Sequence, residues 1–546
     1  MKIDVAGFLG ANTQINKALL PDGVGVQSLN QAPGRGDFNS WREATAVSAL
    51  PVLTPRKTIY RLGRDLVSDS LYWLSWPSVV HAVRGFDRED THERTYFTGA
   101  TGGPAWTDQT MAIASAPYPT ATRPLGVPAP TQAPTLGVNA PGVNEMKEDR
   151  FYCTTFVNDL GWESAPSPPA RVTCNADAKI NVSGLEDAPA GNYGINRRRI
   201  YRTKSGTSGA TEFFFAKELV YASGQSWVEA GEPMSNDALP TQTTLGGWLP
   251  CPSDAKYLTQ LWNEMAAVIS GKAVRPCVAG HIYAYPYDYE ILIAEQPVAL
   301  ATWGQNLLVL TTGSKPSMIT GQDPASLSEM PIDGLNFNAA CQSETSVVNY
   351  THGASWAGPD GLCYLGNSGQ KVITGGLIHP DDWKKMRPST MVGTQYMGMA
   401  VMFYDDGTGY KGFMVDPINP TGIFWLSKGY PAAYSDPKTS SLYVLDGNDI
   451  KKWNAGDAFM TATFVSKSYR TPTTNMGYGR VIADAYPVTL QVLADGLSVC
   501  TRSVVDDQVF SLPGGYEAQV WQLVIQTQGR PVISAHLAES DEELFE

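Results

Sequence analysis

Short apolar strands separated by polar, glycine-containing turns recur between residues 247 and about 475. The predicted strand pairs are 307–311 with 317–320, 362–365 with 371–374, 399–404 with 412–415, and 441–445 with 450–453. The last three turns are centred near residues 367, 407 and 447. A spacing of about 40 residues with several short strands in each unit is typical of propeller blades.

Turn chemistry supports this interpretation. Asp-Gly occurs six times, beginning at residues 22, 333, 360, 406, 446 and 495, and it supplies the positive-φ positions of tight hairpin turns. Helical patterns are few. The candidates are residues 253–267, where a serine cap follows Pro252, and a turn around residues 381–386.

Residues 148–246 follow a different pattern, with six strand candidates in about 100 residues. These candidates are 150–157, 170–174, 178–182, 198–203, 212–219 and 226–229. A proline-rich stretch, residues 116–143, precedes this unit, and Leu245-Gly-Gly-Trp-Leu-Pro follows it. Because proline fixes φ and donates no hydrogen bond, the proline-rich stretch is expected to be a linker or surface strap and not a central strand or helix. The pattern predicts a small β-sandwich inserted into the repeating hairpins.

The remaining regions complete the division of the chain. Residues 1–50 are expected to be extended with short strands, and residues 56–112 contain strand candidates at 58–62, 71–76 and 95–98. Residues 476–546 hold strands at 491–493, 509–512, 518–525 and 532–537, and then an acidic tail. We therefore expect four parts: 1–147 with the first propeller part and the strap, 148–246 as the sandwich, 247–475 as propeller blades, and 476–546 as a small C-terminal β region.

Composition agrees with an all-β chain. Charged residues make up 17 %, and 52 glycines and 38 prolines suit turn-rich β structure better than helices. The formal net charge is −13, which repels phosphates and argues against tight sequence-specific DNA binding. Such a charge does not exclude DNA that passes through a lumen, where weak adhesion is an advantage.

The cysteines and hydrophobic segments indicate in which cellular compartment the chain is made. The seven cysteines form no CxxC pair, and they lie at 153, 174, 251, 277, 341, 363 and 500. An odd number of widely spaced cysteines indicates reduced thiols made in a cytoplasm. The first residues lack the apolar core of a signal peptide, and no run of about 18 apolar residues predicts a membrane span.

Catalytic motifs are missing from the sequence. The six histidines, at 81, 92, 281, 352, 379 and 536, show no zinc-hydrolase spacing, and there is no GxSxG elbow, P-loop or GxGxxG motif. We therefore expect no enzyme activity, no catalytic or metal-binding residues and no cofactor.

Two acidic segments have possible chemical roles. Asp87, Glu89, Asp90 and Glu93 alternate with Arg84, Arg88 and Arg94, and a salt-bridging surface loop is favoured over a glycosidase carboxylate pair. The run Asp405-Asp406-Gly-Thr-Gly lacks the further ligands of an EF-hand, which favours a hairpin turn over a calcium loop.

Three other segments each allow two interpretations. Arg197, Arg198, Arg199 and Arg202, with Tyr193 and Tyr201 nearby, form the densest basic patch, and structural arginines are favoured over phosphate contacts. The tyrosines at 283, 285, 287 and 289 alternate, which favours one packed strand face over a sugar platform. Asn181-Val-Ser183 matches a glycosylation acceptor, but without a secretory signal the match carries little weight.

Ordered motifs along nearly the whole chain resemble the tail nozzle proteins (tail tubular protein B) of short-tailed bacteriophages. The resemblance rests on these segments: Phe8-Leu-Gly, Leu19-Leu-Pro-Asp, Ser28-Leu-Asn, Trp76-Pro, Val79-Val, Glu93-Arg-Thr-Tyr-Phe-Thr-Gly, Trp162-Glu-Ser-Ala-Pro-Ser, Ala188-Pro-Ala-Gly-Asn-Tyr, Arg199-Ile-Tyr-Arg-Thr, Leu308-Val-Leu-Thr-Thr-Gly, Gly321-Gln-Asp-Pro, Gly358-Pro-Asp-Gly-Leu, Val372-Ile-Thr, Ala485-Tyr-Pro-Val, Ala494-Asp-Gly and Phe510-Ser-Leu-Pro. One departure is the Tyr- and Asp-rich segment 286–290, where the family pattern leads us to expect a Phe-Ser-Glu-type strand and a following His-Ala-Trp-Pro.

The resemblance implies a β-propeller interrupted by a fibronectin-type-III-like sandwich, and a homo-hexameric ring in the virion tail. Such a ring lies below the head–tail connector, meets tail fibres or a needle-like plug, holds the genome and lets double-stranded DNA pass at ejection. The subunit would be made in the host cytoplasm, and the family has no catalytic residues to carry over. The alternatives are a receptor- or glycan-binding tail fibre or adhesin and, third, a propeller glycoside hydrolase.

Overall fold

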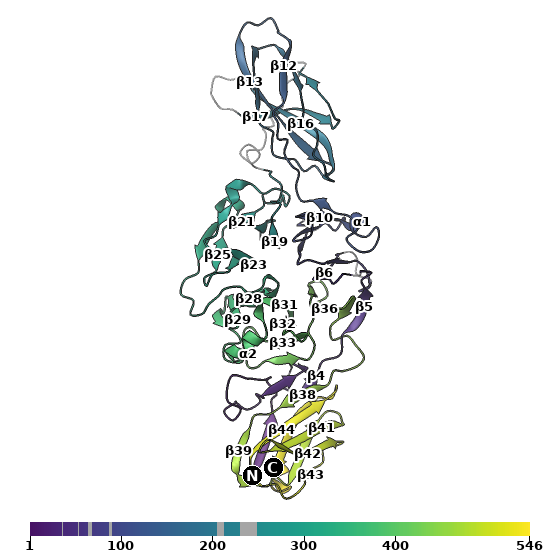
Figure 1. Cartoon of the computed structure of the whole chain (residues 1–546), viewed down its shortest axis with the longest axis vertical. Coiled ribbons are helices and arrows are strands. Elements are labelled where there is room, and N and C mark those ends of the chain that lie inside the picture. Colours follow the sequence, from purple (N-terminus) through teal and green to yellow (C-terminus); the bar gives the residue numbers. More distant parts are fainter. Residues whose placement is uncertain are drawn as a thin grey trace.

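The computed structural model describes residues 1–34, 36–52, 54–63, 68–86, 90–204, 212–229 and 248–545. The chain is nearly all-β, with 46 % of residues in strands and 5 % in helices, as the sequence predicts. Figure 1 shows an elongated molecule with a sandwich at one end, a ring of sheets in the middle, and a second β region with both termini at the other end. The fold class predicted from the sequence is thus confirmed.

Six small sheets and one end of a larger, ten-stranded sheet surround one centre in the middle region of the described chain (Figure 1). The first sheet has two strands, β6 (Thr58–Arg61) and β7 (Trp73–Trp76). The second contains β8 (His81–Arg84), β9 (Thr95–Thr98), β10 (Ala105–Thr107) and β11 (Arg123–Pro124). The third contains β19 (Lys256–Gln260), β20 (Ala266–Ser270), β21 (Ala273–Pro276) and β22 (Ile291–Leu292). The fourth contains β23 (Pro297–Trp303), β24 (Asn306–Thr311), β25 (Ser317–Thr320) and β26 (Ser328–Pro331).

The remaining three sheets complete the ring. The fifth contains β27 (Val348–Tyr350), β28 (Gly353–Ala357), β29 (Leu362–Gly366) and β30 (Gly369–Val372). The sixth contains β31 (Val392–Tyr396), β32 (Met399–Asp405), β33 (Tyr410–Val415) and β34 (Phe424–Leu426). The seventh contains β35 (Ala433–Asp436), β36 (Ser441–Asp446), β37 (Asp449–Lys452) and, from near the N-terminus, β5 (Thr45–Ala49). Apart from the junction of the first and second sheets, the first strands of successive sheets lie next to one another around the ring, which is the arrangement of a β-propeller.

Neighbouring blades share hydrophobic cores. β24 illustrates why, because Leu307, Leu308, Val309 and Leu310 are all fully buried and the strand is therefore covered on both faces. The junction between the two-stranded sheet and the β8–β11 blade is filled by a cluster that includes Leu74, Trp76 and Phe97. These contacts between faces, added to the strand pairing within each sheet, close the ring.

The sandwich is inserted after β11 and consists of two facing sheets. The three-stranded sheet has the order β12 (Thr135–Ala140), β15 (Lys179–Ser183), β18 (Trp227–Val228). The four-stranded sheet has the order β14 (Ala170–Asn175), β13 (Lys147–Asn158), β16 (Ile195–Thr203), β17 (Phe213–Val220). Tyr152, Ile180, Val182 and Ile200 fill the space between the sheets. Within the described chain, all six strand candidates between residues 150 and 229 overlap observed strands.

A second β region combines both ends of the chain. One sheet has the order β1 (Lys2–Ala6), β45 (Val532–Ala538), β40 (Tyr478–Ala483), β43 (Phe510–Ser511). The other contains β2 (Gln27–Leu29), β38 (Ala462–Val465), β44 (Ala518–Thr527), β41 (Val488–Ala494) and β42 (Leu497–Val504), and β39 (Tyr469–Thr474) also pairs with β44. β2 pairs with β38 on one side and with β34 of the propeller on the other, so the two regions share a continuous sheet. The short strands β3 (Gln31–Ala32) and β4 (Asn39–Ser40) pair with each other.

The predicted helix at residues 253–267 is wrong, because this segment forms the hairpin of β19 and β20. Asn263 and Glu264 have φ of 52° and 55° at the hairpin turn, where a helix requires negative φ. The turn predicted around residues 381–386 is confirmed as the short helix α2 (Pro380–Lys385). The helix α1 (Gln109–Ala112) was not predicted, and short 3₁₀ turns occupy Tyr287–Tyr289, Pro324–Ser326, Glu344–Ser346, Pro388–Thr390 and Glu542–Leu544.

The three turns spaced 40 residues apart are not equivalent. The turn near 367 joins the third and fourth strands of its blade, whereas those near 407 and 447 join second and third strands. The proline-rich stretch contributes β11 and β12, and both lie at sheet edges, as expected for a segment that is poor in hydrogen-bond donors. In all six Asp-Gly pairs the glycine has a positive φ, as predicted.

Candidate functional site at the junction of propeller and sandwich

An aromatic stack joins the sandwich to the propeller. Trp162, in the loop between β13 and β14, lies flat on Tyr283 of the propeller, with ring centroids 4.7 Å apart and an interplanar angle of 12°. Trp248 stacks on Tyr283 at 5.5 Å, and Trp106 of β10 meets Trp162 at 5.3 Å. Aromatic pairs at such distances add stabilisation beyond the area they bury. The sandwich is therefore packed against the propeller and not merely tethered to it.

The loop that carries Trp162 is fixed from within the sandwich. The Asn158 side chain accepts hydrogen bonds from the backbone N–H groups of Leu160 and Trp162, at 3.0 and 2.9 Å. The neighbouring Glu163 carboxylate accepts from the Tyr201 hydroxyl at 2.7 Å and pairs with Arg199 at 2.6 Å. Burial, with this carboxylate close by, raises the pKa of Tyr201, so its hydroxyl remains a donor.

A second link is polar. Arg123 of β11 pairs with Asp159 of the β13–β14 loop at 2.8 Å and lies 5.6 Å from the Trp106 ring. Gly194 has a φ of 72° and lies against this ion pair, and a Cβ there would be 2.6 Å from the Asp159 carboxylate. The positive φ favours glycine at this position of the junction.

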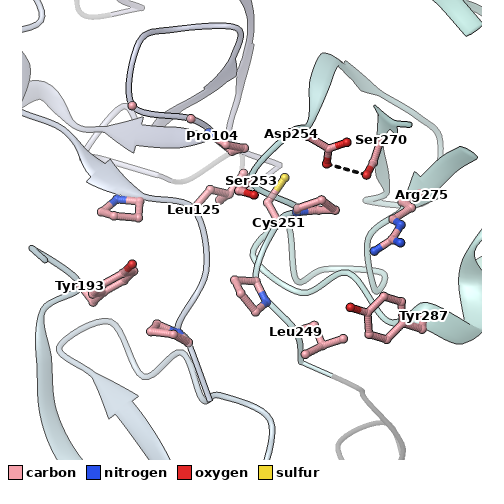
Figure 2. A pocket seen from close by; sticks show the side chains of 16 residues that line it. Pro104, Leu125, Tyr193, Leu249, Cys251, Ser253, Asp254, Ser270, Arg275 and Tyr287 are labelled. Atoms are coloured by element: carbon pink, nitrogen blue, oxygen red, sulfur yellow. Dashed lines mark hydrogen bonds between the residues drawn. The ribbon is translucent and has the colours of Figure 1, made fainter. Parts of the chain in front are cut away.

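A cleft of about 530 Å³ opens beside the junction, between the β8–β11 blade, the β19–β22 blade and the base of the sandwich (Figure 2). Tyr193 and Tyr287 lie on opposite sides of it, and Asp254, Ser270 and Arg275 line the propeller side. Asp254 accepts from the Ser270 hydroxyl at 2.7 Å, and Arg275 pairs with Glu290 at 2.7 Å. Asp254 is the only carboxylate among the described residues that line this cleft. The cleft therefore lacks the two opposed carboxyl groups of a glycosidase.

A second cleft, of about 490 Å³, adjoins the first across the loop Gly102–Pro104. It lies between the β6–β7 sheet and the β8–β11 blade, and Asn192 of the sandwich also lines it. Arg56 and Ser75 line this second cleft. Nothing in the local sequence around either residue indicates a site, since a lone arginine before a strand and a serine within one are ordinary.

The arginine patch is structural. Arg198 is buried, with its guanidinium 5.4 Å from the Phe156 ring and 5.5 Å from the Tyr221 ring. Arg199 pairs with Glu218 at 2.8 Å as well as with Glu163, and Arg202 pairs with Glu229. The patch thus carries no array of free cations for phosphates.

The carboxylate cluster is also internally paired where it is described. Glu93 pairs with Arg84, and Asp90 with Arg94 at 3.6 Å. Asp90 also accepts from the backbone N–H of Arg94 at 2.9 Å. Asp87, Arg88 and Glu89 lie outside the described residues. The described members of the cluster form the salt-bridging loop that the sequence favours over a glycosidase carboxylate pair.

The segment Asp405–Gly409 forms the hairpin turn between β32 and β33, as favoured. Asp406 pairs with Lys411 at 2.6 Å, and hydrogen bonds from Lys411 and Thr408 hold the pKa of this carboxyl well below its usual range. No group of three or more His, Cys, Asp or Glu side chains within the described ranges is placed to hold a metal ion.

The tyrosine run does not form one strand, so that prediction is wrong. Tyr283 and Tyr285 are buried in irregular chain, Tyr287 begins a 3₁₀ turn with 58 % of its surface exposed, and Tyr289 is half-buried. Packing is nevertheless the role of the first two.

Asn181, the asparagine of the glycosylation-acceptor match, lies in β15, which pairs with β12 and β18.

Six of the seven cysteines are buried, Cys500 is partly exposed, and all are free thiols. Burial raises the pKa of Cys277 and Cys341 to about 12, which keeps them protonated and unreactive. No described helix is long and apolar enough to cross a membrane.

The topology and the sites define the class of the chain: a β-propeller with an inserted sandwich and a second, mixed β region. No family model and no curated protein matches it. The solved structures to which it is similar include the WD40 domain of Pan2 from Neurospora crassa, with 7 % identity, a TM-score of 0.30, and coverage of 76 % of this chain and 96 % of that one. They also include BamB from Moraxella catarrhalis, with 11 % identity, a TM-score of 0.21, and coverage of 48 % and 82 %. A third is AztD from Citrobacter koseri, with 10 % identity, a TM-score of 0.26, and coverage of 68 % and 100 %.

Similarities with TM-scores this low carry no argument about function. The propeller assignment follows from the sheet order and the ring of inner strands in this chain itself.

Proposed function

We propose that this chain is a structural subunit of a virion tail, the nozzle of a short-tailed bacteriophage, and that six copies form a ring through which DNA leaves the particle. The observation that carries the proposal is the arrangement of modules. A sandwich interrupts the propeller after β11 and is packed on its rim through Trp162 and Tyr283, which agrees with the architecture that the sequence resemblance implies.

The side-chain chemistry supports a mechanical role. Charged groups that could have formed a site are used within the chain: Glu163 and Arg199 fix the junction loop, and Arg202 and Glu229 pair inside the sandwich. Networks of this kind hold modules in a defined orientation, which a ring under mechanical stress requires.

The proposed mechanism is electrostatic. Duplex DNA is densely negative, and a net charge of −13 per subunit weakens adhesion of phosphates to the ring. Genome retention and ejection would then depend on closing and opening the channel, with partners that include the connector above and fibres or a plug below.

Assembly is the direct test. Recombinant protein would be examined by negative-stain electron microscopy, and its mass by light scattering, alone and with the connector ring from the same particle. We expect hollow six-fold rings with a mass of six 59.0 kDa chains. A trimeric rod, or a compact monomer under both conditions, would refute the nozzle. A basic, DNA-gripping channel in the assembled tail would refute the electrostatic mechanism alone.

A glycan-binding tail protein is the second candidate, because Tyr193 and Tyr287 flank a cleft that also presents Asp254 and Arg275 (Figure 2). Aromatic rings beside polar groups suit sugar rings. Binding of bacterial surface polysaccharides that is lost in Tyr287→Ala, with a monomeric or trimeric protein, would favour this candidate. A clearance assay on the same polysaccharides tests the hydrolase, and we expect no clearance.

A further inference from the structure

The cleft between the β6–β7 sheet and the β8–β11 blade has an unusual charge balance. Among the described residues that line it, Arg56 is the only charged one, and none is Asp or Glu. The part of the chain that the structure describes gives the Arg56 side chain no hydrogen-bond acceptor and no ion-pair partner, and its Nε atom is buried without one. Guanidinium groups that lie partly out of water normally have such a partner.

A second orphaned group lines the same cleft. Ser75 of β7 is a buried residue, and its hydroxyl finds no hydrogen-bond partner within the described ranges of the chain. Its backbone N–H donates to the Tyr118 carbonyl at 3.1 Å, so the strand itself is satisfied and only the side chain is not. A buried polar group without a partner costs free energy, and a group that enters this cleft could satisfy both atoms.

The other polar groups of the lining are neutral. Thr101, Thr122 and Asn192 can each donate a hydrogen bond. Pro77, Pro117 and Pro119 add rigid apolar walls. One cation with hydroxyl and amide donors around it matches an oxyanion, because such a group accepts several hydrogen bonds and neutralises the guanidinium.

We propose that this cleft binds an oxyanion, a carboxylate or phosphate group, with Arg56 as its cationic partner and Ser75 as a hydrogen-bond donor. The volume of about 490 Å³ leaves room for the body of a small molecule behind that group. The site is independent of the proposed nozzle function, since it depends only on groups within one chain.

Thermal unfolding of the full chain tests the site, with inorganic phosphate and acetate as separate probes at an ionic strength held constant with sodium chloride. We expect a saturable rise in Tm with at least one probe, and the comparison of the two identifies the preferred oxyanion. In Arg56→Gln the rise disappears, and calorimetric titration shows affinity for that probe weakened by about tenfold or more. Ser75→Ala weakens it less.

The matched control is Arg470→Gln, since Arg470 is an exposed arginine of β39, far from the cleft in sequence and sheet. This variant should keep the full anion-dependent rise. Without added anion, Arg56→Gln should unfold at the temperature of the unchanged protein or slightly above it, because an unpaired guanidinium does not stabilise the empty cleft. No rise in the unchanged protein, an equal rise in all variants, or marked destabilisation of anion-free Arg56→Gln would each overturn the proposal.

Discussion

At the seam between β8 and β19, the imidazole of His81 stacks on the phenol ring of Tyr257 with centroids 3.8 Å apart. Its Nε2 atom is buried, and no described residue forms a hydrogen bond with it. Burial lowers the pKa of His81 from 6.5 to about 4, because the charged form would lose its hydration. The histidine is therefore neutral in the folded chain over most of the pH range in which the unfolded chain protonates it.

This depressed pKa predicts a loss of stability in acid. Between about pH 6.5 and pH 4 the unfolded state binds a proton at His81 that the folded state does not, so the free energy of unfolding falls as the pH decreases, by at most roughly 3 kcal/mol. His81→Asn should flatten this part of the profile in denaturant titrations. His352→Asn, which changes an exposed histidine, should leave the slope intact; equal slopes in all three proteins would contradict the assignment.

The role of a residue could be predicted from the sequence where its immediate neighbours along the chain determine that role. The paired arginines and the Asp406 turn follow from alternation and turn chemistry alone. Arg56 and His81 could not be found in this way, because a missing partner is a property of the surroundings, and the surroundings come from segments distant in sequence. Trp162 stands in a motif of the sequence resemblance, but its partner Tyr283 is 121 positions further along the chain.

At the scale of elements, closure of the ring depends on β5 pairing with β37. Ile450 of β37 is fully buried in a cluster with Leu50 and Trp73. The blade that β5 completes therefore also packs against the two-stranded sheet of β6 and β7. Ile450→Ala should cost about 3 kcal/mol of unfolding free energy. Hydrogen exchange should then speed up in β5 and β37 before other blades.

The control is Ile533→Ala, because Ile533 lies in β45 with 49 % of its surface exposed. That change should cost less than about 1 kcal/mol and leave exchange in β5 unaltered. If both variants loosened β5 equally, the closing role of this contact would be refuted.

Elements were predicted well where the strand partner is the next strand along the chain. The Asp-Gly hairpins are of this kind, and so are the sandwich strands. The errors have a common cause. Residues 253–267 have a helix-like start, and their identity as a hairpin depends on packing of β19 against β8 and β23. Likewise β1, β2 and β5 pair with strands more than 390 positions away, which no local pattern reveals.

At the scale of the whole molecule, the sandwich extends the chain at the end opposite the termini (Figure 1). Its orientation is expected to depend on Trp162, since the polar link at the junction, Arg123 with Asp159, is a partly exposed ion pair that contributes little stability. Trp162→Ala should therefore free the sandwich, and small-angle X-ray scattering should show a broader distribution of interatomic distances without loss of β structure.

Trp262→Ala provides the comparison, since Trp262 lies in the β19–β20 turn and donates to the Gly321 carbonyl at 2.8 Å, away from the sandwich. Its scattering profile should match that of the unchanged protein. An unchanged profile for Trp162→Ala would mean that the linkers and the remaining contacts, such as Arg123 with Asp159, hold the sandwich in place. In the proposed ring, the same variant should assemble with poorly aligned sandwiches.

The pairing of β5 with β37 also imposes a delay during biosynthesis, because β5 is made long before its partner strand. Roughly 400 residues separate the two strands, and at about 5–20 residues per second a ribosome needs on the order of 20 to 80 s to supply the partner. During that interval β1, β2 and β5 have no strands to pair with, while the inserted sandwich can already fold. Newly made chains would therefore pass through a state with an open ring and unpaired strand edges, and this state is where chaperones, or premature contact with another nascent subunit, would act.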